Sequence, residues 1–230
     1  MSFASELRSV SLALHSRAHL TGRVPQVRRP SLPGVVQYLS DTRGAQAAFR
    51  DRFPVPVPRD LVAALDRDLE ALLTADPTAG ADLDARWASP YGAPSYGAYL
   101  HTLPVSRLGC HWYNANFALA SGGGRVVFER VRGVLPDGFR SAFFEAWDEA
   151  EIDGMRAAFS AEADTWDAGE RTACLSETPR AFAHGMLLLA TLDGPVVTEA
   201  DNGYDGCAPA WATRWVTSKH DTRKPLTPNP

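Results

Sequence analysis

Hydrophobic residues recur at helical spacing along most of the chain. Near its beginning, four of them stand at intervals of four, three and four, which predicts an amphipathic helix over residues 3–20. They are Phe3, Leu7, Val10 and Leu14. Thr21-Gly22 is expected to end this helix, because glycine is common just past a helix C-terminus. A second pattern of the same kind, 35–48, ends at three closely spaced prolines that a helix interior does not accept.

Later segments combine helical spacing with residues that cap helices. Asp60 and Ser95 can each cap a helix, since a short polar side chain accepts hydrogen bonds from free backbone N–H groups. Asp137 is expected to do the same for an aromatic-rich segment. Further helices are therefore predicted at 60–76, 95–103, 108–120, 137–166 and 174–192, the last kinked at Pro179. Only 125–131 has a pattern that a strand would share, and a lone strand has no partner, so the fold class is all-α.

The length and the pattern together predict one domain and a tail. A chain of 230 residues is long for one core and short for two. The helical pattern fills 1–193, which we expect to form a multi-helical bundle. From Gly194 the chain is rich in Gly, Pro and Asp yet holds Trp211 and Trp215. Residues 194–230 are therefore expected to form an irregular C-terminal tail that packs on the bundle or trails from it.

Composition excludes several classes of protein. Hydrophobic residues at 45% and charged residues at 22% are ordinary for a globular chain. The net charge is −4 and the basic residues are scattered, so the sequence has no basic patch that would indicate nucleic-acid binding. Cys110, Cys174 and Cys207 have neither disulfide-framework nor zinc-site spacing, so we expect a reduced, intracellular protein. No apolar run approaches the roughly 20 residues that cross a bilayer, so no membrane span is expected.

Arg8 and His15 are the first residues with candidate chemistry. Seven positions on one helix leave two side chains about 20° apart around the axis and about 10 Å apart along it. That span is of the order of the distance from a haem iron to its propionates. The helix therefore has the spacing to offer an imidazole to iron and a guanidinium to a carboxylate. The alternative is that His15 is an ordinary hydrogen-bonded side chain and Arg8 is solvated.

A run of three glycines, 122–124, interrupts a helical stretch. Each glycine inside a helix costs about 1 kcal/mol relative to alanine, so the run needs a compensating reason. Without Cβ atoms, the backbone can approach a flat ligand closely and can kink. The alternative is a flexible turn between two helices.

These two segments resemble those of a known family, the heme oxygenases, and within it the plant and algal ferredoxin-dependent branch. The stretch CHWYNANFALASGGGR, 110–125, is similar to that branch's distal helix, which reads roughly CHFYNxYFAHxAGGR. The stretch LRSVSLALHSR resembles the family's proximal helix, in which a basic residue precedes the iron-ligating histidine by seven positions. Weaker similarity in VVQYLSD, SYGAYL and CLSETPRAF extends the resemblance over about 3–192.

The resemblance implies a function and a set of site residues. Haem would be both cofactor and substrate, opened oxidatively to biliverdin, CO and iron. His15 would ligate the iron, Arg8 and Arg156 would hold the propionates, and Phe182 would form an aromatic wall. The catalytic residues implied are His15, Gly122 and Gly123, the glycines pressing on one edge of the ring. The other haem-binding residues implied are Tyr113, Ala118 and Leu119.

Partners and location follow from the same resemblance. The electron donor would be a ferredoxin or another reductant. A ferredoxin is acidic, so its docking patch should be basic. The candidate residues are Arg8, Arg17, Arg23, Arg28 and Arg29. We expect a monomer, in the plastid stroma if a presequence has been removed and in the cytoplasm otherwise.

One departure from the family pattern leaves two functions open. The family has Asp or His two or three positions before its glycines, where it organises water that helps oxygen activation. Here Leu119 or Ala120 falls on that place, and the segment is one residue longer. The nearest polar candidates are His111, Asn114 and Asn116. The alternative function is therefore a haem- or tetrapyrrole-binding pseudo-enzyme without turnover.

A third hypothesis is an oxygenase of the same fold with two non-haem irons. That chemistry needs several carboxylates and histidines on facing helices, typically with Glu-x-x-His pairs. The sequence has no such pair.

Overall fold

Helices make up all the regular structure in the part of the chain that the structure describes. The computed structural model describes residues 2–20, 27–81, 83 and 95–193. Eight α-helices lie within these ranges: α1 (Phe3–Leu20), α2 (Leu32–Arg52), α3 (Leu61–Ala75), α4 (Tyr96–Thr102), α5 (Val105–Ala118), α6 (Gly124–Val131), α7 (Glu149–Asp164) and α8 (Ala168–Ala190). Three short 3₁₀ segments, η1 (Pro77–Gly80), η3 (Arg132–Val134) and η4 (Thr191–Asp193), and one π turn, η2 (Leu119–Gly123), complete the regular elements. The predicted all-α class is confirmed.

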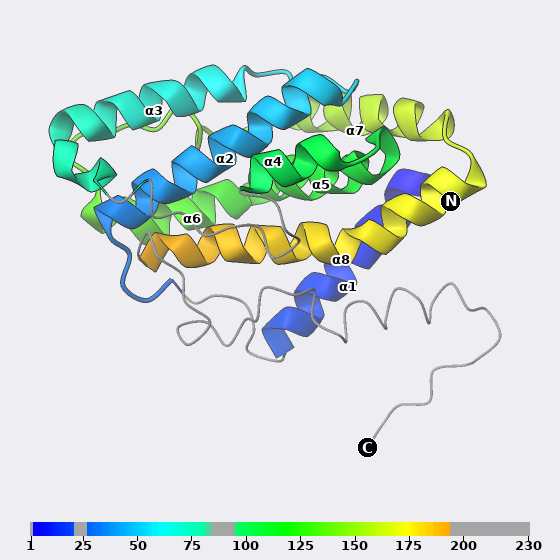
Figure 1. Ribbon diagram of the computed structural model, residues 1–230, viewed down its shortest axis with the longest axis horizontal. Helices are drawn as coiled ribbons and strands as arrows, with labels where there is room; N and C mark the ends of the chain where they lie inside the picture. Colours follow the sequence, from blue (N-terminus) through cyan, green and yellow to red (C-terminus); the bar gives the residue numbers. More distant parts are fainter. Residues whose placement is uncertain (1, 21–26, 82, 84–94, 194–230) are drawn as a thin grey trace.

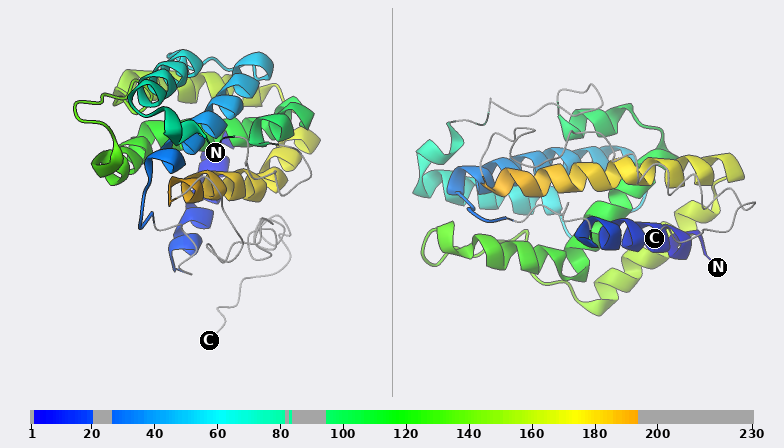
Figure 2. Two further views of the ribbon diagram at one scale, coloured as in Figure 1. Left: turned by 60° about the vertical axis from the view of Figure 1, so that its left-hand side comes forward. Right: turned by 90° about the horizontal axis from the view of Figure 1, so that it is seen from below.

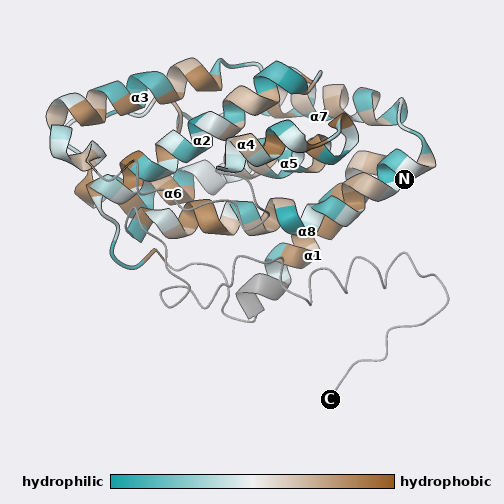
Figure 3. Cartoon of the chain, in the orientation of Figure 1, coloured by the Kyte–Doolittle hydropathy of each residue, from teal (hydrophilic) through white to brown (hydrophobic). Residues whose placement is uncertain are grey.

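The helices pack around one core that α2, α5 and α8 share. Helix α2 lies against α3 and α4, and α5 lies against α8 (Figure 1). Helix α1 crosses beside α8, and its C-terminal end projects from the bundle (Figure 2). Hydrophobic and hydrophilic residues alternate around the helices, as amphipathic packing requires (Figure 3). At the centre, the buried rings of Trp112 and Phe159 stack with 5.7 Å between centroids.

Local capping explains where several helices begin. The side chains of Asp60 and Ser95 accept hydrogen bonds from the third backbone N–H beyond them, at 3.0 and 3.1 Å. Both predicted caps are confirmed. Asp148 and Asp167 form capping boxes at the starts of α7 and α8, so α8 begins earlier than the prediction at 174. Pro179 lies inside α8, as expected.

The helix predicted from Asp137 is wrong. Residues 135–147 form turns and bends, and α7 begins only at Glu149. The cause is Asp68 on α3, whose buried carboxylate accepts hydrogen bonds from the Ala142 and Phe143 backbone N–H groups at 2.8 and 3.1 Å and from the Ser141 hydroxyl. These bonds draw the backbone out of a helical path. The segment 125–131, whose pattern a strand would share, belongs instead to helix α6.

Three expectations fall on residues outside the described ranges: the stop at Thr21-Gly22, the boundary at Gly194 and the tail 194–230. Among the helices that are described, none is both long and apolar enough to cross a membrane.

Candidate functional site

Helix α1 presents its candidate residues on the outside. Leu7 and Leu14 are buried and hold the helix against the core, whereas Arg8 and His15 are exposed. Leu12, between them in sequence, is 54% exposed, which is unusual for a leucine on a packed helix. The His15 ring meets the Phe182 ring of α8 edge-on, with 6.5 Å between centroids. The structure thus brings the expected iron ligand next to the expected aromatic wall.

Arg8, Tyr113 and Arg156 converge from three different helices. Tyr113 of α5 is buried, and its ring packs on Phe117 and Phe159 with centroid distances of 4.5 and 5.1 Å. Burial raises the pKa of the Tyr113 hydroxyl, and the positive charges of Arg8 and Arg156 partly oppose that increase. Helix α7 packs against both α1 and α5, and Phe159, one turn after Arg156, is the α7 residue whose ring contacts Tyr113.

Arg8, Tyr113 and Arg156 are the candidates for binding an anion at the packing of α1, α5 and α7. Two exposed guanidinium groups and one phenolic O–H offer donors and positive charge, and carboxylates bind to such groups by charge-assisted hydrogen bonds. Arg156 already forms an ion pair with Asp153, one turn earlier on α7, and both side chains are about half exposed. An exposed pair of this kind is weak and can yield to a ligand.

The glycine run forms a kink with a defined geometry. Gly122 has φ 100° and ψ −6° inside the π turn, a conformation that side-chain-bearing residues rarely adopt. A Cβ at Gly122 would meet no described atom within 4 Å, so this side of the backbone is open. A Cβ at Gly123 would lie 2.3 Å from the Ala118 carbonyl oxygen, and one at Gly124 would lie 2.6 Å from the Leu119 side chain. A side chain is therefore disfavoured at each of the three positions, at Gly122 by its backbone conformation and at Gly123 and Gly124 by close neighbouring atoms.

Side chains around the kink divide between an open and a buried side. Ala118 and Gly122 are exposed, whereas Leu119 and Ala120 are 9% and 8% exposed. The Ser121 hydroxyl donates to the Phe117 carbonyl oxygen at 2.5 Å. The residues on the open side are thus small, and the one hydroxyl in the turn is hydrogen-bonded to its own helix.

The three polar residues nearest to the missing distal group in sequence all form hydrogen bonds elsewhere. Asn114 donates to the Cys110 carbonyl oxygen at 2.8 Å. Asn116 donates to the Trp112 carbonyl oxygen at 3.0 Å and accepts from Gln46 at 3.1 Å. His111 is fully buried in the network described next.

A buried polar network joins α4, α5 and α8. The Glu177 carboxylate accepts from the Tyr99 hydroxyl at 2.5 Å and from Arg180 at 3.1 Å, and it lies 3.4 Å from His111 Nε2. The other ring nitrogen of His111, Nδ1, lies 2.9 Å from the Tyr96 hydroxyl. Burial raises the pKa of the Glu177 carboxyl, but its hydrogen bonds with His111 and Tyr99 outweigh burial and hold that pKa below its usual value.

The same network keeps two histidines neutral. Burial lowers the pKa of His111, although its hydrogen bond to Glu177 opposes the decrease. Burial and the nearby His111 lower the pKa of His184 to about 3. The His184 ring stacks on Tyr96 and Tyr99 at 4.3 and 4.9 Å, and its Nδ1 donates to the Arg180 carbonyl oxygen at 2.9 Å. Neither imidazole faces solvent, so neither is placed to receive a ligand.

The sequence analysis missed most of this network. Glu177, Arg180 and His184 stand at spacings of three and four, which places them on one face of α8. That spacing was the available signal. Nothing local indicates that Tyr96, Tyr99 and His111 meet this face.

Two further observations bear on the expected partners. Of the five arginines expected to form the donor-docking patch, Arg8, Arg28 and Arg29 are exposed, and the side chains of Arg17 and Arg23 lie outside the described part. Among the described residues, no three His, Cys, Asp or Glu side chains gather as a metal site would require.

The structure thus defines the class as an all-helical bundle in which one exposed helix face carries Arg8 and His15 and a glycine kink joins α5 to α6. No protein-family model matches the chain, and no curated protein matches it either.

Proposed function

We propose that the protein binds haem on the exposed face of α1 and opens it oxidatively to biliverdin, CO and iron, as a heme oxygenase-like enzyme. The observation that carries the proposal is that Arg8 and His15 are both exposed on one face of α1, with the Phe182 ring against His15 and with α7, which carries Arg156, packed beside the helix. Haem carries two carboxylates on one edge and an iron at its centre. A basic pair and an imidazole about 10 Å apart along a helix complement that arrangement.

Each residue of this face has a distinct role in the proposal. His15, neutral at Nε2, coordinates the iron, and Phe182 packs against its ring and limits the ring's rotation. Arg8 and Arg156 pair with propionates, and Tyr113 donates its O–H to one of them. Together these three residues fix the rotation of the macrocycle in its own plane and so determine which edge is attacked.

A leucine side chain and a glycine backbone can also contact the flat faces of the haem ring in this proposal. Exposed Leu12 lies on the same helix between Arg8 and His15, where it can cover part of a flat apolar ring. In the proposal, the backbone at Gly122, which has open space on its Cβ side, lies against the opposite face of the ring. Bound haem supplies the iron that activates oxygen and is itself the substrate, so the residues supply placement and exclusion of water.

A spectrum of His15→Ala with hemin tests the proposal. Because His15 is exposed and its loss leaves no cavity, the variant should fold as the wild type does. It should lose the low-spin absorption spectrum of bound hemin and regain it when imidazole is added. His101→Ala, which removes another exposed histidine from α4, is the matched control. An unchanged hemin spectrum in His15→Ala would reject this residue as the ligand.

A second candidate function is haem binding without turnover. It is favoured by the apolar side chains of Leu119 and Ala120 and by the engagement of Asn114, Asn116 and His111 elsewhere. With hemin and ascorbate, or ferredoxin and its reductase, the second function gives a haem spectrum but no biliverdin, whereas the first gives biliverdin, which we expect the wild type to form slowly. Leu119→His should raise the yield and Leu119→Met should not. Rapid, stoichiometric biliverdin formation by the wild type would contradict the idea of a weakened distal side.

A further inference from the structure

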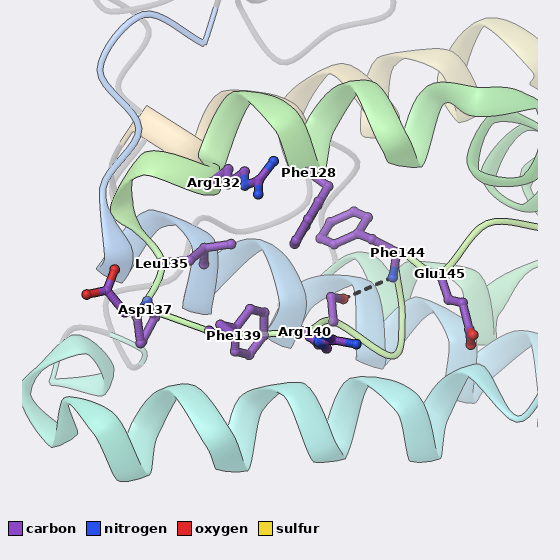
Figure 4. A pocket seen from close by; sticks show the side chains of 11 residues that line it. Phe128, Arg132, Leu135, Asp137, Phe139, Arg140, Phe144 and Glu145 are labelled. Carbon is purple, nitrogen blue, oxygen red and sulfur yellow. Dashed lines mark hydrogen bonds between the residues drawn. The ribbon is translucent and has the colours of Figure 1, made fainter.

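A half-open pocket lies between the end of α6 and the irregular segment 135–145. Its volume is about 600 Å³, within the range of small-molecule sites. None of the residues proposed to bind haem lines it. The lining residues used below are Phe128, Arg132, Phe139, Arg140 and Phe144 (Figure 4).

Aromatic rings form the apolar part of this pocket. Phe128 of α6 and Phe144 of the loop approach each other with 5.7 Å between centroids and 42° between planes. Behind Phe144, the buried ring of Tyr38 stacks nearly parallel to it at 6.1 Å. Phe128, Phe139 and Phe144 are all only half-buried, so each leaves ring surface available. A flat apolar group can therefore pack here.

The loop that carries these rings is held in place. Asp68 is 2% exposed and accepts from the backbone N–H groups of Ala142 and Phe143 and from the Ser141 hydroxyl. The Phe144 N–H in turn donates to the Ser141 hydroxyl oxygen at 3.0 Å. The aromatic wall thus exists before any ligand arrives, which lowers the entropy cost of binding.

The charged residues of the pocket are two arginines, Arg132 and Arg140, and two carboxylates, Asp137 and Glu145. Figure 4 shows the carboxylates of Asp137 and Glu145 at opposite ends, directed away from the rings. Glu145 faces Arg59, with 3.9 Å between their charged atoms. Arg132 is 3.8 Å from Glu129, an exposed contact. Arg140 is exposed and forms no hydrogen bond or ion pair with the residues that the structure describes, so its guanidinium is available to a ligand.

We propose that this pocket binds a small aromatic carboxylate. The ring system lies against Phe128 and Phe144, and the carboxylate pairs with the Arg140 guanidinium. The site is separate from the proposed haem site, and its occupancy does not depend on haem. The departure of 135–147 from the helix that its sequence predicts is consistent with this role, since such conflicts concentrate at functional sites.

Titration with 2-naphthoate, followed by calorimetry, tests the proposal. We expect saturable one-to-one binding with a sub-millimolar Kd and at least tenfold weaker binding of 2-naphthylmethylamine, which carries the opposite charge. Arg140→Gln should weaken 2-naphthoate binding about tenfold. Arg130→Gln removes the same charge from an exposed residue of α6 that does not line the pocket, and it should bind as the wild type does.

Two more variants separate this site from the others. Phe128→Ala should weaken 2-naphthoate binding while the melting temperature shows whether the fold persists. His15→Ala should leave 2-naphthoate binding unchanged, whatever its effect on hemin. The proposal is overturned if 2-naphthoate does not bind, if Arg140→Gln binds it as well as Arg130→Gln does, or if the amine binds equally well.

Discussion

The buried network between α4, α5 and α8 and the exposed face of α1 use the same residue types in opposite ways. In the network, His111, Tyr99 and Arg180 surround one carboxylate, and burial keeps the histidine neutral. On α1, Arg8 and His15 are exposed on a helix held by its leucines. The difference separates side chains that stabilise the fold from side chains that the fold presents to a ligand.

Helix α5 connects the two regions. His111 and Tyr113 are two positions apart, which is about 200° around a helix. One therefore faces the buried network while the other faces the arginines of α1 and α7. The network fixes the rotation of α5 and so determines where the Tyr113 hydroxyl lies.

The largest effect should come from Glu177→Ala. This change leaves the Tyr99 hydroxyl, His111 and Arg180 without their common partner, and breaking a buried pair typically costs about 3–5 kcal/mol. Urea denaturation should show a loss of that size in the free energy of unfolding. Glu129→Ala, which removes an exposed carboxylate, should change it by less than about 0.5 kcal/mol. Equal losses in the two variants would show that the network does not stabilise the fold.

Acid should destabilise the protein through the same network. The pKa of His184 is about 3 in the folded protein and about 6.5 in an unfolded chain, so between these values the unfolded chain binds more protons. The stability contributed by neutral His184 is complete above pH 6.5 and declines as pH falls. It should decrease by about 2 kcal/mol between pH 7.5 and pH 5. His184→Phe retains a stacked ring without titrating, and a pH dependence as steep as that of the wild type would disprove this cause.

Reversing the charge of Arg8 or Arg156 should affect hemin binding rather than folding. Arg8→Glu or Arg156→Glu should weaken hemin binding about tenfold or more, because a charge-assisted pair is replaced by repulsion. Since both side chains are exposed, the free energy of unfolding should change little. Arg107→Glu, an exposed position of α5, is the control for net charge. Wild-type hemin affinity in both variants would mean that haem is oriented by other residues.

Much of the fold follows from local sequence. The spacing of Leu7, Val10 and Leu14 places α1 correctly, and Asp60 and Ser95 mark the helices that they cap. The kink at 122–124 is local too, because glycine is required where φ is positive. Short-range periodicity and capping are sufficient where a segment's conformation depends on its neighbours in sequence.

The remaining features depend on partners far along the chain. Asp68 is more than 70 positions from the loop whose N–H groups donate hydrogen bonds to it. The local sequence of 137–147 does not contain this partner and therefore predicts a helix. Glu177 is 66 positions from His111 and 78 from Tyr99. For the candidate site, helical spacing indicated Arg8 and His15, and the resemblance added Arg156. The approach of both arginines to Tyr113 required the packing of three helices.

The kink at Leu119–Gly123 separates the helical register of α5 from that of α6. One residue added to a regular α-helix rotates every later side chain by about 100°. At Ser121 and Gly122 the backbone leaves the helical conformation, so α6 does not continue the helical register of α5. The orientation of α6 is therefore set at the kink and by its own packing, whereas one residue added a turn earlier would rotate Trp112 or Phe117 out of the core.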